Sequence, residues 1–169
     1  MEGRGSQWWA HSSRLVTVKL QFGQSLLHVA SCYAPTFAAR REDKNRFFEG
    51  LWQYILSVDE NEELIILGDF NARTGSGGDA SNVWSHVNGP FGLGKVNDAG
   101  EELLSFLSLM ELTICNSWFQ YKDIHKATWR HPRSGRWHCI DYAITRCRDL
   151  KWCLDTRVVR GAECSTDHL

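Results

Sequence analysis

Residues 63 to 71, Glu-Leu-Ile-Ile-Leu-Gly-Asp-Phe-Asn, decide how the rest of the sequence is interpreted. Four aliphatic residues in a row, β-branched at the centre and followed by Gly68, predict a short strand buried on both sides. Asp69 and Asn71 follow at the carboxyl end of this strand. An Asp in that position often only caps a turn, so Asp69 alone favours a structural role over a chemical one.

Helical and extended patterns surround this strand on both sides. Apolar residues recur at helical spacing from residue 40 to 58, which predicts an amphipathic helix over one face of a sheet. A second helix is expected to begin near Asn97 or Asp98, with Asp98 and Glu101 spaced as a capping box. Strands are expected at residues 15 to 20 and 26 to 32, paired as a hairpin, and at residues 113 to 116, 127 to 130, 139 to 145 and 157 to 160.

The Gly-rich residues 74 to 94 predict a long surface loop. Because helices and strands are mixed, the fold class is α/β or α+β with layered packing. The chain of 169 residues is 43% hydrophobic and 23% charged, with a formal net charge of -1, which are the proportions of one globular domain rather than a disordered or fibrous chain.

The sequence contains no apolar run of the ~20 residues that span a bilayer, and no secretory signal. We therefore expect an intracellular protein, nuclear or cytoplasmic, that is not secreted and has no membrane partner. Positive charge is concentrated at the end: residues 121 to 169 carry ten Lys and Arg against six Asp and Glu, which is compatible with a polyanionic partner or with a solvated surface. Six irregularly spaced Cys residues without a CxxC pair predict reduced thiols rather than disulfides or zinc.

Acidic and His residues near strand ends are the candidates for chemistry. Asp141 lies within an apolar strand pattern, where a half-buried carboxylate needs a partner, and His168 is the natural one. Carboxylates with one His suit the metal-assisted attack of water on a phosphodiester. The P-loop, GxSxG, HExxH and GxGxxG patterns are absent, which disfavours nucleoside-triphosphate and serine-hydrolase chemistry.

Four segments resemble, in order, the motifs of the endonuclease/exonuclease/phosphatase superfamily. They are residues 32 to 36 (CYAPT), 66 to 72 (ILGDFNA), 128 to 129 (TW) followed by 140 to 142 (IDY), and 166 to 168 (TDH). GDFNARTG, the Trp-rich segment before IDY, and residues 160 to 168 are most similar to the endonuclease domains of non-LTR retrotransposons and to craniofacial development protein 2-like proteins. The resemblance implies a partial four-layer α/β sandwich, with two mixed β-sheets flanked by helices, in which residues 1 to 169 are the C-terminal portion of a single domain.

The resemblance also implies roles for individual residues. Asp69 would activate the attacking water, Asn71 would position the water and the phosphate, and Tyr33 would hydrogen-bond the phosphate. Asp141 would brace His168, which contacts the phosphate, and these residues should converge on one cleft. Asp167 would bind the metal ion, Mg²⁺ or alternatively Mn²⁺, and DNA would be the partner. For Trp129, we expect ordinary core packing.

The sequence departs from the family pattern by lacking the N-terminal strands that carry a catalytic Asn and a metal-binding Glu. Glu42, Asn45 and Glu49 lie on the expected helix and are no substitutes. We therefore expect a Mg²⁺-dependent DNA endonuclease truncated at both ends and impaired as it stands, with an exposed sheet edge or an exposed apolar face where strands are missing. The alternative is a non-catalytic retroelement-derived fragment with weak nucleic-acid binding, and a small-molecule or lipid phosphatase is less favoured.

Overall fold

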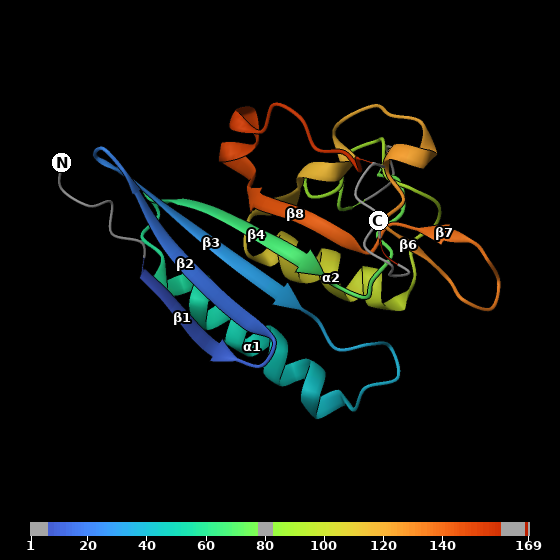
Figure 1. Cartoon of the computed structure of the whole chain (residues 1–169), viewed down its shortest axis with the longest axis horizontal. Helices are drawn as coiled ribbons and strands as arrows, with labels where there is room; N and C mark the ends of the chain where they lie inside the picture. Colours follow the sequence, from blue (N-terminus) through green and yellow to red (C-terminus); the bar gives the residue numbers. More distant parts are fainter. Residues whose placement is uncertain (1–6, 78–82, 160–167, 169) are drawn as a thin grey trace.

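A computed structural model describes residues 7 to 77, 83 to 159 and 168, and its centre is a six-stranded sheet (Figure 1). The strands lie in the order β1-β2-β3-β4-β8-β5. Neighbouring strands are antiparallel except for β3 and β4, which are parallel. The strands are β1 (Gln7–Ser12), β2 (Leu15–Phe22), β3 (Ser25–Tyr33), β4 (Glu63–Asp69), β5 (Leu112–Ile114) and β8 (Asp141–Arg146).

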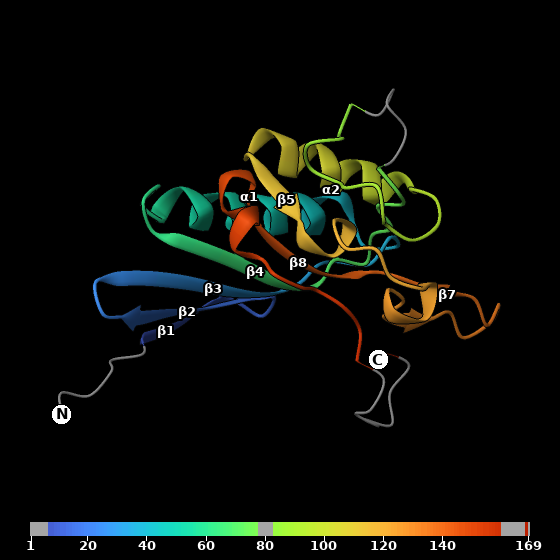
Figure 2. The same cartoon turned by 90° about the horizontal axis from the view of Figure 1, so that it is seen from above.

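Two helices cover one face of this sheet, as Figure 2 shows. Helix α1 (Arg41–Ser57) connects the parallel strands β3 and β4, as the crossover of such a pair requires, and it buries an apolar stripe that includes Leu51 and Ile55. Helix α2 (Asp98–Leu109) buries Leu103, Leu104 and Leu107. Both helices fall where the apolar spacing predicts them, and with the sheet they form the core.

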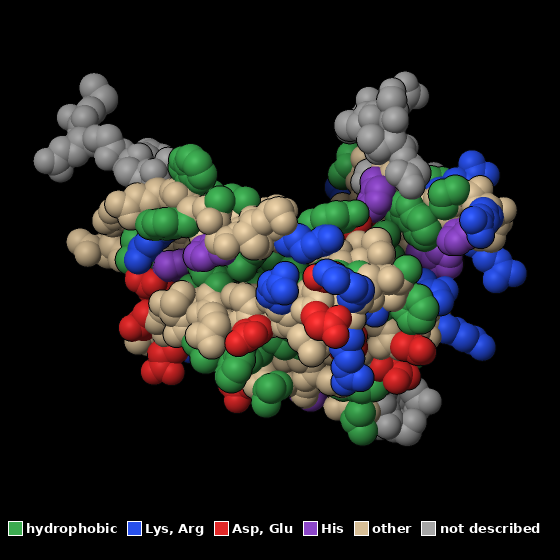
Figure 3. Space-filling model, turned by 90° about the horizontal axis from the view of Figure 1, so that it is seen from below, with side chains coloured by type: hydrophobic (Ala, Val, Ile, Leu, Met, Phe, Trp, Pro, Cys, Tyr) green, Lys and Arg blue, Asp and Glu red, His purple; other side chains and the backbone are tan. Residues whose placement is uncertain are grey.

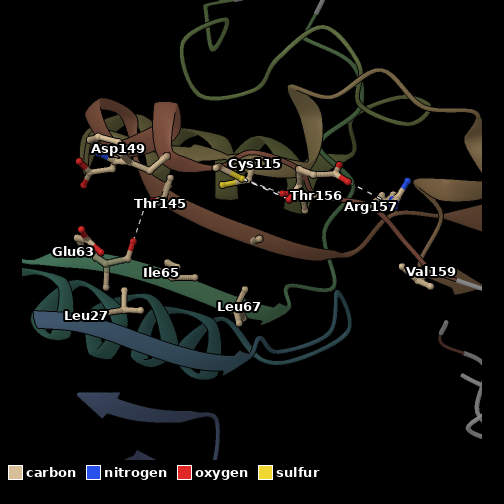
Figure 4. Close-up of a pocket in the computed structure, with 15 residues that line it drawn as sticks. Leu27, Glu63, Ile65, Leu67, Cys115, Thr145, Asp149, Thr156, Arg157 and Val159 are labelled. Carbon is tan, nitrogen blue, oxygen red and sulfur yellow. Dashed lines mark hydrogen bonds and ion pairs between the residues drawn. The ribbon is translucent and has the colours of Figure 1, made fainter. Parts of the chain in front are cut away.

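Among the residues that the structure describes, little covers the opposite face of the sheet. Val16 of β2 and Leu67 of β4 lie on this face and remain 40% and 42% exposed. Figure 4 shows the part near β4 and β8, where a cavity of about 600 Å³ lies between the sheet and the segment that follows 3₁₀ helix η3 (Cys147–Trp152). The exposed apolar face expected from the sequence is therefore present.

A two-stranded antiparallel ribbon, β6 (Trp129–Arg130) with β7 (Trp137–His138), forms a second sheet. Short 3₁₀ helices precede it at η1 (Cys115–Ser117) and η2 (Asp123–His125). The α/β class is confirmed, and the described residues supply the large mixed sheet, one helical layer and this small ribbon. No helix in the described ranges is long and apolar enough to cross a bilayer.

Several local predictions are wrong. Strand β4 is buried on one side, at Leu64 and Ile66, but not on the other. Helix α2 is capped by Asn97, whose side chain accepts a hydrogen bond from the Gly100 N–H, so Asp98 and Glu101 do not form a capping box. Strand β1 lies in a segment for which no strand is predicted. Residues 157 to 159 are not in a strand, and residue 160 lies outside the described residues.

Candidate active site

Three residues with predicted roles stand in one row across the sheet. Tyr33 ends β3, Asp69 ends β4 and Asp141 begins β8, and the strand register pairs Tyr33 with Asp69 and Asp69 with Asp141. Because paired residues in neighbouring strands point to the same face, all three belong to the open face of the sheet. The row exists because β3 and β8 both pair with β4 at its carboxyl end.

His168 completes the cluster from a distant part of the chain. It forms an isolated antiparallel bridge with Trp129, which brings its imidazole over the row. Its Nδ1 lies 3.1 Å from Asp141 Oδ2, and its Nε2 lies 3.9 Å from Asp69 Oδ2. The contact between Asp141 and His168 that the sequence predicts is present. The imidazole is thus held between two carboxylates, of which the Asp69 side chain is the more buried.

The same three side chains could bind a metal ion. One carboxylate oxygen each from Asp69 and Asp141 and one imidazole nitrogen of His168 lie within 4.8 Å of one another. Carboxylate oxygens suit hard divalent cations, and imidazole is a common ligand of transition metals. Asp167, the expected metal ligand, lies outside the described residues.

Asn71 is held beside the cluster by a tight turn. Its backbone has a φ of 50°, a left-handed conformation that Asn tolerates better than most residues. Its N–H donates to Asp69 Oδ1 over 2.7 Å, and its side-chain amide donates to the Ala34 carbonyl over 2.9 Å. The turn therefore fixes one oxygen of Asp69 and links the ends of β3 and β4, while the Asn71 amide is directed to Ala34 rather than to His168.

Two further residues that sequence reasoning missed hold Asp141 and the segment after β4. Thr128 Oγ1 accepts hydrogen bonds from the backbone N–H groups of Ile140 and Asp141, at 3.1 and 3.3 Å. The buried Tyr142 hydroxyl lies 2.9 Å from the Ala72 carbonyl, and its pKa is well above the usual range because burial disfavours the phenolate. The TW and IDY motifs contain both residues, so the motifs were the available signal, although the hydrogen bonds were not predictable from them.

A hollow of about 700 Å³ adjoins the cluster on the side of the β6–β7 ribbon. Asn71, Arg73, Trp129 and Arg136 are among its lining residues, together with His138. Burial, and after it the charge of Arg73, lowers the pKa of His138 and so favours its neutral form. Figure 3 shows Lys, Arg and His side chains gathered at this end of the molecule.

The core-packing interpretation of Trp129 is wrong. Trp129 is only partly buried, and it lines the hollow rather than the core. Its ring lies 6.0 Å from the His138 ring and 6.5 Å from the His168 ring, measured between centroids. An aromatic face is therefore available beside the carboxylate and imidazole cluster.

The fold is that of known nucleic-acid enzymes. The chain is similar to a variant of the 3' phosphatase NExo from Neisseria bound to a product DNA hairpin, with a TM-score of 0.59 and 16% identity over 92% of this chain and 62% of that one. It is also similar to the endonuclease domain of TRAS1, a telomere-specific non-LTR retrotransposon, with a TM-score of 0.55 and 14% identity over 82% of this chain and 52% of that one. A comparison with models of protein families finds no match.

The likeness to these two structures confirms the fold predicted from the sequence, and the predicted resemblance to the endonuclease/exonuclease/phosphatase superfamily is confirmed as well. In sequence, the chain is 32% identical to craniofacial development protein 2 of Bos taurus over 157 residues. The match covers 93% of this chain and 26% of the relative, so the chain spans about a quarter of the length of that protein.

Proposed function

We propose that this chain carries part of a metal-dependent phosphodiesterase site that cuts DNA. The observation that carries the proposal is the position of the His168 imidazole between Asp141 and Asp69, where β4 ends and β8 begins. One carboxylate can orient the imidazole while the other accepts a proton from the attacking water. Phosphodiester hydrolysis needs both functions. The DNA hairpin bound to NExo supports DNA as the substrate.

Each residue of the cluster has one task in this reaction. Asp69 orients the attacking water and accepts its proton, because its Oδ1 is already fixed by the Asn71 N–H and its Oδ2 faces His168. Asp141 holds the imidazole, which donates a hydrogen bond from Nε2 to a phosphate oxygen. Tyr33, in the same row, hydrogen-bonds the phosphate from the other side.

The carboxylate oxygens of Asp69 and Asp141, which lie close together, suit Mg²⁺ or Mn²⁺. We propose Asp167 as a further ligand, since it precedes His168 directly. Bound there, the cation would neutralise charge on the phosphate and on the leaving oxygen. The residues of the chain would still orient the water and hold the phosphate.

We expect slow turnover from the 169-residue chain by itself. Within the described ranges, only Asp69 and Asp141 bring carboxylates to the cluster, and both contact His168. Few oxygens are then left for a hard cation that binds reluctantly through few protein ligands. Non-catalytic binding of nucleic acid is the second candidate, favoured by the Arg, His and Trp side chains around the hollow beside the ribbon.

A nicking assay under single-turnover conditions tests the proposal. With Mg²⁺ or Mn²⁺, we expect Asp69→Asn and His168→Gln each to slow nicking of supercoiled plasmid ~100-fold or more, because each removes a group that acts on the water or the phosphate. Glu49→Gln and His86→Gln, exposed residues outside the cluster, serve as matched controls and should change the rate less than about twofold.

Nicking that persists in EDTA, or that survives both substitutions in the cluster, would contradict the proposal. If the native chain binds the plasmid but does not nick it with either cation, the result supports the non-catalytic alternative. These outcomes are separable because binding and nicking are scored on the same gel.

A further inference from the structure

We propose that Arg14 is a positioning residue for Tyr33, holding its phenol in the row formed with Asp69 and Asp141. The inference rests on the proposed function, because it assigns to Arg14 the task of keeping the Tyr33 hydroxyl ready for a phosphate oxygen. Arg14 lies in the turn between β1 and β2, nineteen positions before Tyr33.

Three contacts join Arg14 to Tyr33. The Arg14 carbonyl accepts a hydrogen bond from the Tyr33 N–H at 3.0 Å, and Arg14 Nη1 donates to the Tyr33 carbonyl at 3.1 Å. The guanidinium carbon also lies over the Tyr33 ring, 5.2 Å from its centroid. The first contact is between backbones, whereas the other two need the Arg14 side chain. The hydrogen bond to the Tyr33 carbonyl fixes the end of β3, and the guanidinium over the ring fixes the phenol.

Tyr33 needs such support because of where it stands. It is the last residue of β3 and 51% of its surface is exposed, so packing alone leaves the ring free on its solvent side. A phenol that must meet one phosphate oxygen gains from being held before the substrate arrives. The guanidinium supplies that hold and also places a positive charge at the end of a row that otherwise carries two carboxylates.

Arginine suits this position better than lysine does. A planar guanidinium can lie over an aromatic ring and at the same time direct an N–H to a carbonyl, whereas an ammonium group is a compact charge without a plane. The substitution Arg14→Lys therefore removes the geometry and keeps the charge. This variant therefore distinguishes a role of Arg14 in positioning Tyr33 from an electrostatic attraction between Arg14 and the DNA.

The test is a double-mutant cycle on DNA binding, read by fluorescence anisotropy of a labelled duplex with Ca²⁺ present in place of Mg²⁺. We expect Tyr33→Phe to raise Kd about three- to tenfold, the size of one typical hydrogen bond. Arg14→Lys should raise Kd by a similar factor, and the double variant should bind no more weakly than Tyr33→Phe alone. The salt dependence of Kd should not change in Arg14→Lys, because the number of charges is the same.

Arg46→Lys is the matched control, since Arg46 lines the same hollow of about 450 Å³ as Arg14 but pairs with Asp43 instead of Tyr33. It should change Kd less than about twofold. Thermal unfolding of every variant checks that the fold is intact, and Arg14→Gln provides a second variant that removes the guanidinium.

Additive effects of Arg14→Lys and Tyr33→Phe would overturn the inference, because Arg14 would then act independently of Tyr33. Full affinity in Arg14→Lys with weakened binding in Tyr33→Phe would also overturn it, while leaving the proposed function intact. Full affinity in Tyr33→Phe removes the role of Tyr33 and the inference together. Absence of DNA binding by the native chain overturns both the inference and the proposed function.

Discussion

Asp141 keeps its place beside His168 because of a hydroxyl group on another segment. Thr128 is buried, and its Oγ1 accepts hydrogen bonds from two consecutive N–H groups at the start of β8. A buried N–H without a partner costs more free energy than the hydrogen bond itself contributes. The geometry of the candidate site therefore depends on a buried residue outside the cluster of Asp69, Asp141 and His168.

We expect Thr128→Val to lower the free energy of unfolding by ~2 kcal/mol, because Val has nearly the same shape but accepts no hydrogen bond. It should also slow nicking, because the Asp141 N–H loses its hydrogen bond to Thr128 Oγ1 and the Asp141 side chain is then held less firmly beside His168. Thr145→Val is the matched control: Thr145 is also buried in β8 and donates to the Leu64 carbonyl away from the site. Chemical denaturation and the nicking assay measure the two effects. A loss of nicking as large in Thr145→Val would show that general stability, not Asp141, is responsible.

The motifs predict the contact between Asp141 and His168, and they name Asp69 and Tyr33 as further members of the site. They do not predict the contact of Thr128 with Asp141, nor that of Arg14 with Tyr33. Both are hydrogen bonds between segments distant in sequence, and such bonds leave no local pattern. The wrong interpretation of Trp129 has the same origin, since an apolar side chain looks alike in sequence whether it lines a core or a hollow.

At the scale of elements, the close approach of β3 and β4 depends on Gly68. A Cβ atom at this position would lie 1.9 Å from the Cys32 carbonyl oxygen, and the φ of Gly68 is 152°. Neither the contact nor the backbone conformation suits another residue. Gly68 precedes Asp69 directly, so the tight approach aligns the row of site residues.

We expect Gly68→Ala to destabilise the protein by ~3 kcal/mol or more, because the new methyl group must push two paired strands apart. Gly50→Ala is the control: a Cβ there meets no atom within 4 Å, and the residue lies inside α1, where Ala should stabilise by ~0.5 to 1 kcal/mol. Thermal melts of both variants give the comparison. An unchanged melting temperature in Gly68→Ala would show that β3 can move at little cost.

Periodicity predicts α1, α2 and the β2–β3 hairpin, because each buries one face and the apolar spacing records it. Strand β1 is missed because Gln7 to Ser12 contains no β-branched residue and every one of its residues is exposed. The two-sided burial expected for β4 is wrong for a different reason. An apolar run shows that both faces of a strand can be buried. It does not show that other elements pack against both faces.

On the scale of the whole molecule, the open face of the sheet is the dominant surface feature. Val16, Leu67 and Trp8 lie on it, and Trp8 is 71% exposed. Large apolar side chains exposed together on one face of a sheet favour association. The protein combines a well-packed helical side with a sheet face that still presents apolar groups to solvent.

We expect the purified chain to associate as its concentration rises, in sedimentation velocity experiments. Substituting Val16→Thr together with Leu67→Gln should shift association to higher concentration, because less apolar surface is removed from water. The exposed substitutions Leu109→Gln and Leu56→Gln, on the helical side, serve as the control pair. A native chain that remains monomeric at every concentration would contradict this expectation.

The pairing of β4 with β8 has a consequence for how the protein folds. The two strands that carry Asp69 and Asp141 are joined by a long stretch of chain, as the pairing of Ile65 with Thr145 shows. Closing a flexible loop of roughly eighty residues costs ~4 kcal/mol of chain entropy before any contact within the pair is gained. Non-local strand pairs of this kind form slowly compared with helices and hairpins. We therefore expect the two carboxylates around His168 to come together late in folding, after the helices and the β2–β3 hairpin have formed.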